Sequence, residues 1–247
     1  MKDKIAIVTG AGQGIGRAIA LSLAEHGAHV AVIDINSEAA QRVAAEIQGL
    51  GQRAAALTAD VADEQQVRAM VDAAASFFGR IDILVNNAGI VQTGPLTEIS
   101  AAAWDKVMAV NLKGVFLCCK AVFPIMMAQR SGKIINIASV AGKRGGGLLG
   151  NSCYAASKGG VIAFTKALAR EGGPYNINVN AVTPALTDTE MTSGLTMEQR
   201  EAIIKMMPLG RAGRPQDIAN AVCFLASDYA AFITGEIMDV DGGLMLD

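Results

Sequence analysis

Short apolar runs alternate with longer amphipathic stretches along most of this chain. The short runs are rich in Val, Ile and Ala, which is typical of buried strands, whereas the longer stretches place Ala, Leu and Val at helical spacing. Strands that alternate with helices predict βαβ units and a parallel sheet. We expect seven strands, at residues 4–9, 29–34, 53–58, 82–86, 133–138, 176–182 and 236–240.

This order of elements predicts an α/β fold with a doubly wound, seven-stranded parallel sheet of the Rossmann type. Right-handed crossovers place helices on both faces of such a sheet, and ligands bind beyond the carboxyl ends of its strands. No linker, repeat or low-complexity tract interrupts the pattern, so residues 1–247 are predicted to form a single domain. The longest irregular stretches, 142–151 and 184–196, both follow strands and are expected to be lids or binding loops.

Composition narrows the classes of partner. Hydrophobic residues make up 51% of the chain and aromatic residues only 4%, which suits an aliphatic core between sheet and helices. The net charge of -2, with both signs interspersed, provides no basic face for a phosphate backbone. We therefore expect a small-molecule substrate and no nucleic-acid partner.

The sequence favours a cytoplasmic location. Its first residues, MKDKIAIVTG, contain no apolar segment followed by a small-residue cleavage site, and no apolar run approaches the roughly 20 residues of a spanning helix. We expect no membrane association. The cysteines Cys118, Cys119, Cys153 and Cys223 have neither disulfide-framework nor metal-site spacing, so we expect buried thiols and no metal.

A glycine-rich turn follows the first predicted strand, in Thr9-Gly10-Ala11-Gly12-Gln13-Gly14-Ile15-Gly16. Glycines permit a tight turn, let the backbone approach a pyrophosphate and aim a helix N-terminus at its charge. The spacing differs from the GxGxxG fingerprint because position 15 is Ile, and a purely structural turn is the alternative. Its place between a strand and a helix favours dinucleotide binding.

Acidic residues stand at or just after the ends of the next two strands. Asp34 can accept hydrogen bonds from ribose hydroxyls and would repel a 2′-phosphate, which favours NAD over NADP. The alternative is an Asp that caps a helix or a turn. Asp60 follows the third strand, near where an adenine would lie, but it could equally begin the next helix.

Tyr154 and Lys158 are one helical turn apart, so they share a helix face. A phenol with a reference pKa of about 10 exchanges protons poorly at neutral pH. A nearby ammonium, together with an oxidised nicotinamide ring, is expected to lower that pKa. Taken alone, a Tyr and a Lys at this spacing more often lie on an exposed helix face without a function. The surrounding motifs in the sequence are what favour a catalytic role.

Several ordered motifs resemble those of the short-chain dehydrogenase/reductase family: Thr9-Gly10-xxx-Gly14-x-Gly16, Asn86-Asn87-Ala88-Gly89, Ser139, Tyr154-xxx-Lys158, Asn178-Val179-Asn180-Ala181 and Val240-Asp241-Gly242-Gly243. The resemblance covers essentially the whole chain. It implies that Tyr154 is the general acid/base, that Lys158 lowers its pKa and holds the nicotinamide ribose, and that Ser139 orients the substrate oxygen. Asn111 matches the family's asparagine that holds a proton-relay water, the alternative being a polar residue that bends a helix.

The resemblance also implies a set of cofactor contacts and a class of reaction. The contacts are Gly10, Gln13, Gly14, Ile15, Gly16, Asp34, Asp60, Val61, Asn87, Ala88, Gly89, Tyr154, Lys158, Pro184, Leu186 and Thr189. The reaction is NAD(H)-dependent interconversion of a secondary alcohol and a ketone, with a sugar, polyol or small hydroxy compound as the first interpretation. A 3-oxoacyl-acyl-carrier-protein reductase using NADPH is the alternative. A non-redox epimerase or lyase, or an NAD-sensing protein of the same fold, forms a different class; the presence of both Tyr154 and Lys158 favours the enzyme.

Two departures from the family pattern concern the substrate side. Pro184-Ala185 stands where Pro-Gly is usual, and the segment between Ser139 and Tyr154 is about two residues longer than is common. Lys143 and Arg144 in that segment could bind an anionic substrate group or form a solvated basic turn. Met191, Met197, Met206 and Met207 could line an adaptable lid or pack ordinary helices.

The resemblance further implies a homotetramer. Relatives associate through two long helices and the last strand, which correspond here to residues 104–129, 153–171 and 235–246.

Overall fold

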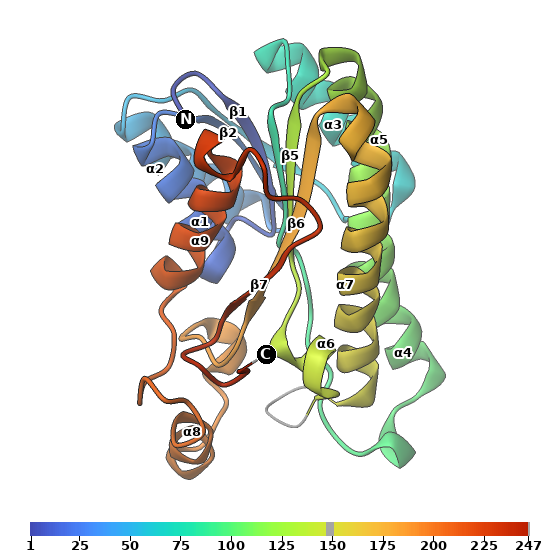
Figure 1. Cartoon of the computed structure of the whole chain (residues 1–247), viewed down its shortest axis with the longest axis vertical. Coiled ribbons are helices and arrows are strands. Elements are labelled where there is room, and N and C mark those ends of the chain that lie inside the picture. Colours follow the sequence, from blue (N-terminus) through green and yellow to red (C-terminus); the bar gives the residue numbers. More distant parts are fainter. Residues whose placement is uncertain (147–150, 247) are drawn as a thin grey trace.

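Seven parallel strands form the centre of the molecule in the order β3-β2-β1-β4-β5-β6-β7 (Figure 1). The computed structural model describes residues 1–146 and 151–246. The predicted α/β fold and all seven predicted strands are confirmed, with ends that differ by at most two residues. The strands are β1 (Ile5–Thr9), β2 (His29–Asp34), β3 (Ala54–Thr58), β4 (Ile83–Asn86), β5 (Gly132–Ile137), β6 (Ile177–Pro184) and β7 (Ile237–Val240).

Helices cover both faces of this sheet (Figure 1). On one face lie α1 (Gly14–Glu25), α2 (Ser37–Gly49) and α9 (Pro215–Ala226), and on the other lie α3 (Glu64–Phe78), α5 (Gly114–Gln129) and α7 (Ser152–Gly172). Three shorter α-helices are also described: α4 (Ala101–Met108), α6 (Val140–Arg144) and α8 (Met197–Ile204). The layers form one α/β/α domain.

Alternate side chains of each strand supply two separate cores. In β1, Ala6 and Val8 pack in the core shared with α1, α2 and α9, whereas Ile7 between them packs in the core shared with α3, α5 and α7. Both faces of a parallel sheet are buried by its crossover helices, so its strands are apolar throughout. This explains why the sequence shows continuous apolar runs rather than an apolar–polar alternation.

The chain changes direction across the sheet at β1. Ile7 of β1 is paired with Ala31 of β2 on one side and with Leu84 of β4 on the other. The crossovers that leave β1 and β4 therefore run to opposite sides, and a crevice opens beyond their carboxyl ends. The segments that follow β1, β4 and β5 meet at this crevice.

One continuous helical stretch, 101–129, contradicts the expectation that no segment is long and apolar enough to cross a membrane. It consists of α4, a π-helical turn (Ala109–Lys113) and α5. Helix α5 packs against α3 and the sheet, and the fully buried side chain of Asn111 makes hydrogen bonds within the protein. A core helix that is apolar on most of its surface meets the same length and composition test.

The two expected loops are more ordered than predicted. Helix α6 begins at Val140, so residues 142–144 are helical and not irregular, because the Ser139 side chain caps this helix. The remainder of the stretch 142–151 includes residues 147–150, which lie outside the described part of the chain. In the other loop, Thr187 forms a β-bridge with Gly213, and a 3-10 turn (Glu190–Thr192) follows.

Candidate active site

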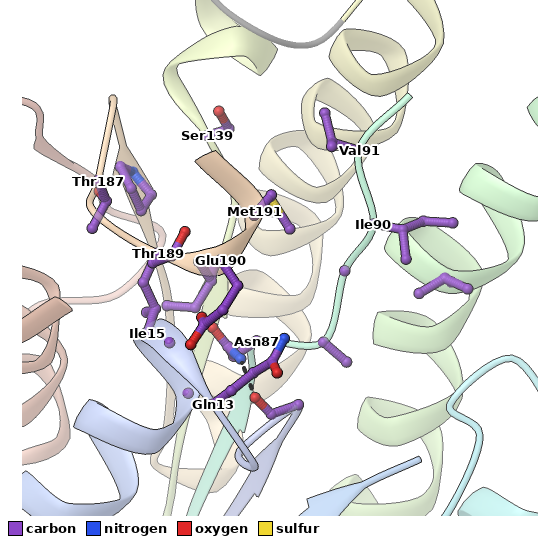
Figure 2. A pocket seen from close by; sticks show the side chains of 18 of the residues that line it. Gln13, Ile15, Asn87, Ile90, Val91, Ser139, Thr187, Thr189, Glu190 and Met191 are labelled. Carbon is purple, nitrogen blue, oxygen red and sulfur yellow. Dashed lines mark hydrogen bonds between the residues drawn. The ribbon is translucent and has the colours of Figure 1, made fainter. Parts of the chain in front are cut away.

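A cavity of about 650 Å³ lies beyond the carboxyl ends of the central strands. Every residue that the sequence predicted as a cofactor contact lines it, and so does Ser139. Figure 2 shows Gln13 and Ile15 of the glycine turn at one end and Ser139 at the other, with Thr189 and Glu190 between them. The cavity is therefore continuous from the glycine turn to the helix that carries Tyr154.

The glycines of the turn have different physical roles. A Cβ on Gly16 would lie 2.1 Å from the Gly10 carbonyl oxygen, and one on Gly10 would lie 2.8 Å from Ala88 Cα, so both positions need close backbone packing. Gly14 has φ +52°, and a Cβ there would lie 3.4 Å from Glu190 Oε2 and 3.5 Å from Thr189 Cγ2. Gly14 also begins α1, whose N-cap residue Gln13 makes no side-chain capping hydrogen bond. The first turn of α1 is thus left open toward the cavity.

Asp34 stands at the rim of the cavity with its carboxylate fixed by the backbone. Its Oδ2 accepts a hydrogen bond from Gly12 N (2.8 Å), and its Oδ1 accepts one from Asn36 N (2.9 Å). The cap of α2 is Asn36, whose side chain accepts from Ala39 N. Asp34 is therefore not a helix cap, although its bond from Asn36 N closes a turn. It holds a negative charge beside the glycine turn, at the place where the sequence predicted a ribose.

Asp60 likewise does not begin the following helix. Asp63 caps α3, and its side chain accepts hydrogen bonds from Gln65 N and Gln66 N. Asp60 Oδ1 accepts from Ala62 N (2.9 Å), and the residue lines the cavity next to Val61. The structure thus resolves this alternative in favour of a cavity position.

Tyr154 and Lys158 face each other across one turn of α7. The Lys158 Nζ lies 5.9 Å from the centre of the Tyr154 ring and donates a hydrogen bond to the Ile137 carbonyl oxygen (2.7 Å) at the end of β5. Burial lowers the pKa of Lys158 to about 8. Burial also raises the pKa of Tyr154, and hydrogen bonding with the Ser139 side chain lowers it in part.

The raised pKa of Tyr154 differs from the sequence-based expectation. In the polypeptide alone, the burial of the phenol outweighs the neighbouring groups, because removing an ionisable group from water disfavours its charged form. The expected lowering therefore needs a further positive charge at the cavity end of the phenol. A nicotinamide ring in its oxidised form carries such a charge.

Ser139 is placed by the helix that it begins. As the N-cap of α6, its Oγ accepts a hydrogen bond from Ala141 N (3.1 Å). A hydroxyl that accepts in this way keeps its own proton free to donate. Ser139 lines the cavity and interacts with Tyr154, so two hydroxyl groups converge at one end of it.

Asn111 lies behind the cavity and does not line it. Its Oδ1 accepts from Ile90 N (2.8 Å), and its Nδ2 donates to Ile90 O (2.9 Å) and Ser157 Oγ (3.1 Å). The side chain thereby fastens the segment after β4 to α7, between Tyr154 and Lys158. It sits in the π-helical turn, a feature that often occurs at functional sites. The water-holding role stays a prediction.

Sequence reasoning missed part of the cavity wall. Val91, Lys106 and Val110 line the side formed by the segment after β4, α4 and the π-helical turn, and Glu190 lines the opposite side. Ile90 and Val91 directly follow Asn86-Asn87-Ala88-Gly89, so their position after a strand end was an available signal. Lys106 had none, because it reaches the cavity only through the packing of α4.

Lys143 is not placed to bind an anionic substrate group. Its Nζ lies 2.6 Å from Asp239 Oδ2 in β7, and neither Lys143 nor Arg144 is among the described residues that line the cavity. Of the four methionines considered for a lid, Met191 lines the cavity, whereas Met207 is buried in a small core with Leu186.

Ala185, which stands where the family usually has Gly, adopts its backbone conformation without strain. The only described residues other than glycine with positive φ are Asp3, Arg130 and Asn176. Ala185 therefore keeps an ordinary backbone conformation, and it lines the cavity beside Pro184 and Leu186.

The cysteines take no part in the cavity. All four are buried and unpaired, and burial raises the pKa of Cys118 and Cys223 to about 12. Among residues 1–146 and 151–246, no group of His, Cys, Asp or Glu side chains is arranged to hold a metal ion.

The cavity fits a nicotinamide dinucleotide. It is long enough to connect an acidic side chain at one end with two converging hydroxyls at the other, and it passes the open first turn of α1. An open helix N-terminus suits a pyrophosphate, and Asp34 suits a ribose diol.

Comparisons with known proteins agree with this geometry. A family model described as enoyl-(acyl carrier protein) reductase matches residues 10–245. The chain is 47% identical to the 3-oxoacyl-acyl-carrier-protein reductase FabG of Staphylococcus aureus, over 98% of both chains. It is 41% identical to the enzyme of the same name from Thermotoga maritima, over 100% of this chain and 99% of that one.

Solved structures show the same relationship. Levodione reductase superposes with a TM-score of 0.94 at 38% identity, and the match covers 98% of each chain. The matched part of this chain spans the glycine turn, Ser139, Tyr154 and Lys158. The chain belongs to the short-chain dehydrogenase/reductase family.

Proposed function

We propose that this oxidoreductase, which interconverts a CH–OH group and a ketone, reduces the 3-oxo group of an acyl thioester with NADH. The observation that carries the substrate class is the 47% identity, over nearly the full length of both chains, to a 3-oxoacyl-acyl-carrier-protein reductase. Val91, Leu186 and Met191 support it, because they give the substrate side of the cavity apolar walls suited to an acyl chain.

The preference for NAD(H) rests on Asp34. A carboxylate whose two oxygens are fixed by Gly12 N and Asn36 N cannot turn away from a 2′-phosphate without losing both hydrogen bonds. Gln13 adds no positive charge at the turn. This proposal departs from the NADPH use that we expected for a 3-oxoacyl reductase.

The residues at the reacting end have the following roles in the proposal. The bound nicotinamide supplies or accepts the hydride. Ser139 donates a hydrogen bond to the substrate oxygen, and Tyr154 donates the proton to that oxygen in reduction and removes it in oxidation. Lys158, held by the Ile137 carbonyl, keeps a positive charge beside the phenol. Asn111 fixes the distance between the segment after β4 and α7.

A second candidate function is the oxidation of a small secondary alcohol, such as a sugar or polyol, with NAD. The observation that favours it is again Asp34, because a preference for NAD suits oxidation as well as reduction. Both candidates use the same catalytic residues, so they differ only in the substrate.

A panel assay separates the two. Acetoacetyl-CoA, a 3-oxoacyl thioester, is offered with NADH and separately with NADPH, and sugars, polyols and hydroxy acids are offered with NAD; the change in NADH absorbance is recorded. We expect the highest kcat/KM for the thioester with NADH. Higher kcat/KM for an alcohol, with no thioester reduction, would select the second candidate. Faster reaction with NADPH would contradict the role of Asp34.

We also propose that the protein forms a homotetramer in a reducing compartment, the cytoplasm. Phe116 of α5 and Phe164 of α7 form an edge-to-face pair, and Phe116 is 44% exposed. Near β7, Phe232 and Leu246 are almost fully exposed. Apolar surface of this kind suits association, and four unpaired thiols suit a reducing environment. Sedimentation tests the assembly.

A further inference from the structure

An ion pair joins the helix that begins at Ser139 to the last strand of the sheet. Lys143 Nζ of α6 lies 2.6 Å from Asp239 Oδ2 of β7, and the two side chains are only 18% and 17% exposed. Ion pairs that are partly shielded from solvent are screened by salt much less than fully exposed pairs. This pair is therefore positioned to restrain α6.

Helix α6 needs such restraints because it is only five residues long. A helix of this length is not stable by itself and takes its place from tertiary contacts. On one side, Gly142 approaches α7 so closely that a Cβ would lie 2.7 Å from the Lys158 carbonyl carbon. On another side, Lys143 reaches Asp239. The two contacts come from consecutive residues and lead to different elements.

The Asp239 carboxylate has a second partner besides Lys143, so its orientation is fixed from both oxygens. The Thr183 hydroxyl donates a hydrogen bond to Asp239 Oδ1, while Oδ2 faces Lys143. Thr183 directly precedes Pro184, which lines the cavity on the cofactor side. The contacts among Lys143, Asp239 and Thr183 thus link the serine side of the cavity to β6, which ends at Pro184.

We propose that Lys143 and Asp239 are positioning residues that hold the Ser139 hydroxyl in place for the substrate oxygen. Neither residue lines the cavity, so they act through α6 and not by contact with the substrate. The inference rests on the proposed function in one respect, namely that Ser139 binds the reacting oxygen. It gives Lys143 a role other than the anion binding considered from the sequence.

Kinetics of a double-mutant cycle test the proposal. Lys143→Met is expected to lower kcat about tenfold to a hundredfold, as misplacement of a polarising group does, and to leave the KM for NADH unchanged. In the Ser139→Ala background, the same substitution is expected to lower kcat by less than about twofold, because the group that it positions is absent. Lys143→Arg, which retains the charge, is expected to keep most of the activity.

Lys133→Met is the matched control. Lys133 is also a partly buried lysine, and its Nζ bonds Asn178 Oδ1 (2.8 Å) at the opposite end of β5 and β6. It should change kcat by less than about twofold. A loss in Lys143→Met that is as large in the Ser139→Ala background as in the wild type would overturn the proposal.

Hydrogen exchange provides a readout that needs no substrate. Lys143→Met and Asp239→Asn are each expected to speed amide exchange about tenfold in residues 140–146, with little change in the rest of the sheet. Unchanged exchange there would also refute the proposal. If the wild type fails to reduce acetoacetyl-CoA, the proposed substrate is wrong; the kinetic cycle is then run on the alcohol found by the panel.

Discussion

The ammonium of Lys158 is held against the Tyr154 ring by a main-chain carbonyl and not by a carboxylate. Its hydrogen bond to Ile137 O at the end of β5 fixes the charge 5.9 Å from the ring centre. Burial is the cause that lowers its pKa, and among residues 1–146 and 151–246 no opposite charge offsets the cost of burying this ammonium. The charge beside the phenol is therefore maintained at the expense of folding stability.

The first prediction is that this cost disappears at high pH. The pKa of Lys158 is about 8 in the folded protein and 10.5 in the reference state, so below pH 8 both states are protonated and the full cost of about 3 kcal/mol applies. Between these values the unfolded chain binds more protons, and stability rises with pH. Relative to Lys158→Met, the wild type should gain about 3 kcal/mol between about pH 7 and pH 11 in urea unfolding.

Lys120→Met, which alters an exposed lysine on α5, is the control and should show no such trend. A difference between wild type and Lys158→Met that stays constant with pH would contradict the low pKa of Lys158.

The second prediction concerns the pH profile of alcohol oxidation. Hydrogen bonding with Ser139 lowers the pKa of Tyr154 against the effect of burial. Ser139→Ala removes this contribution, so the limb of kcat/KM that reports phenol ionisation should move to higher pH. Tyr154→Phe should lower kcat about a thousandfold and leave NADH binding, measured by fluorescence, nearly unchanged. A limb at the same pH in Ser139→Ala would rule out this coupling.

The third prediction is a change in cofactor preference. Asp34→Asn keeps an oxygen that can accept from Gly12 N but removes the negative charge. The KM for NADPH should fall about tenfold or more, and the KM for NADH should rise only slightly, because the repulsion of one charge pair at a partly exposed site is worth roughly 1 to 2 kcal/mol. Asp63→Asn, at the cap of α3 and outside the cavity, is the control. An unchanged NADPH preference would show that Asp34 does not select the cofactor.

The fourth prediction concerns the contact between α6 and α7. Gly142→Ala would place a methyl group 2.7 Å from the Lys158 carbonyl carbon and from Gly159 N, so one helix must move. We expect a loss of about 1 to 3 kcal/mol in stability and a large fall in kcat. Gly49→Ala in α2 is the control, because nothing lies within 4 Å of a Cβ added there. This variant should raise the free energy of unfolding by about 0.5 to 1 kcal/mol, because Ala favours a helix over Gly. Equal behaviour of the two variants would exclude a tight α6–α7 contact.

The strands and the cavity residues were predictable because they depend on local patterns. Apolar runs of β-branched residues are buried on both faces, and parallel strands bring their carboxyl ends to one edge, which places Asp34, Asp60, Asn87 and Ser139 together. The hydrogen bonds that these side chains make were harder to predict. The helices that Asp34 and Asp60 could have capped are instead capped by Asn36 and Asp63, which lie two and three residues further along the chain.

Features that depend on tertiary packing could not be predicted. The partner of Lys143 is 96 residues away in the sequence, so nothing near Lys143 indicated that its charge is paired. The pKa of Tyr154 depends on burial, which no sequence pattern gives. Likewise, the partners of Asn111 could not be predicted, because only the structure shows its side-chain amide bonded to Ile90 and Ser157.

The central pairing of β1 with β4 has a consequence for how the chain folds during synthesis. Ala6 pairs with Ile83, so one side of β1 has no neighbour until β4 has left the ribosome, whereas β2 can pair with β1, and β3 with β2, much earlier. Contacts of such long sequence separation form slowly because their loops must close first. We expect nascent chains from which β4 has not yet emerged to expose an unsatisfied strand edge and to be the stage most prone to aggregation.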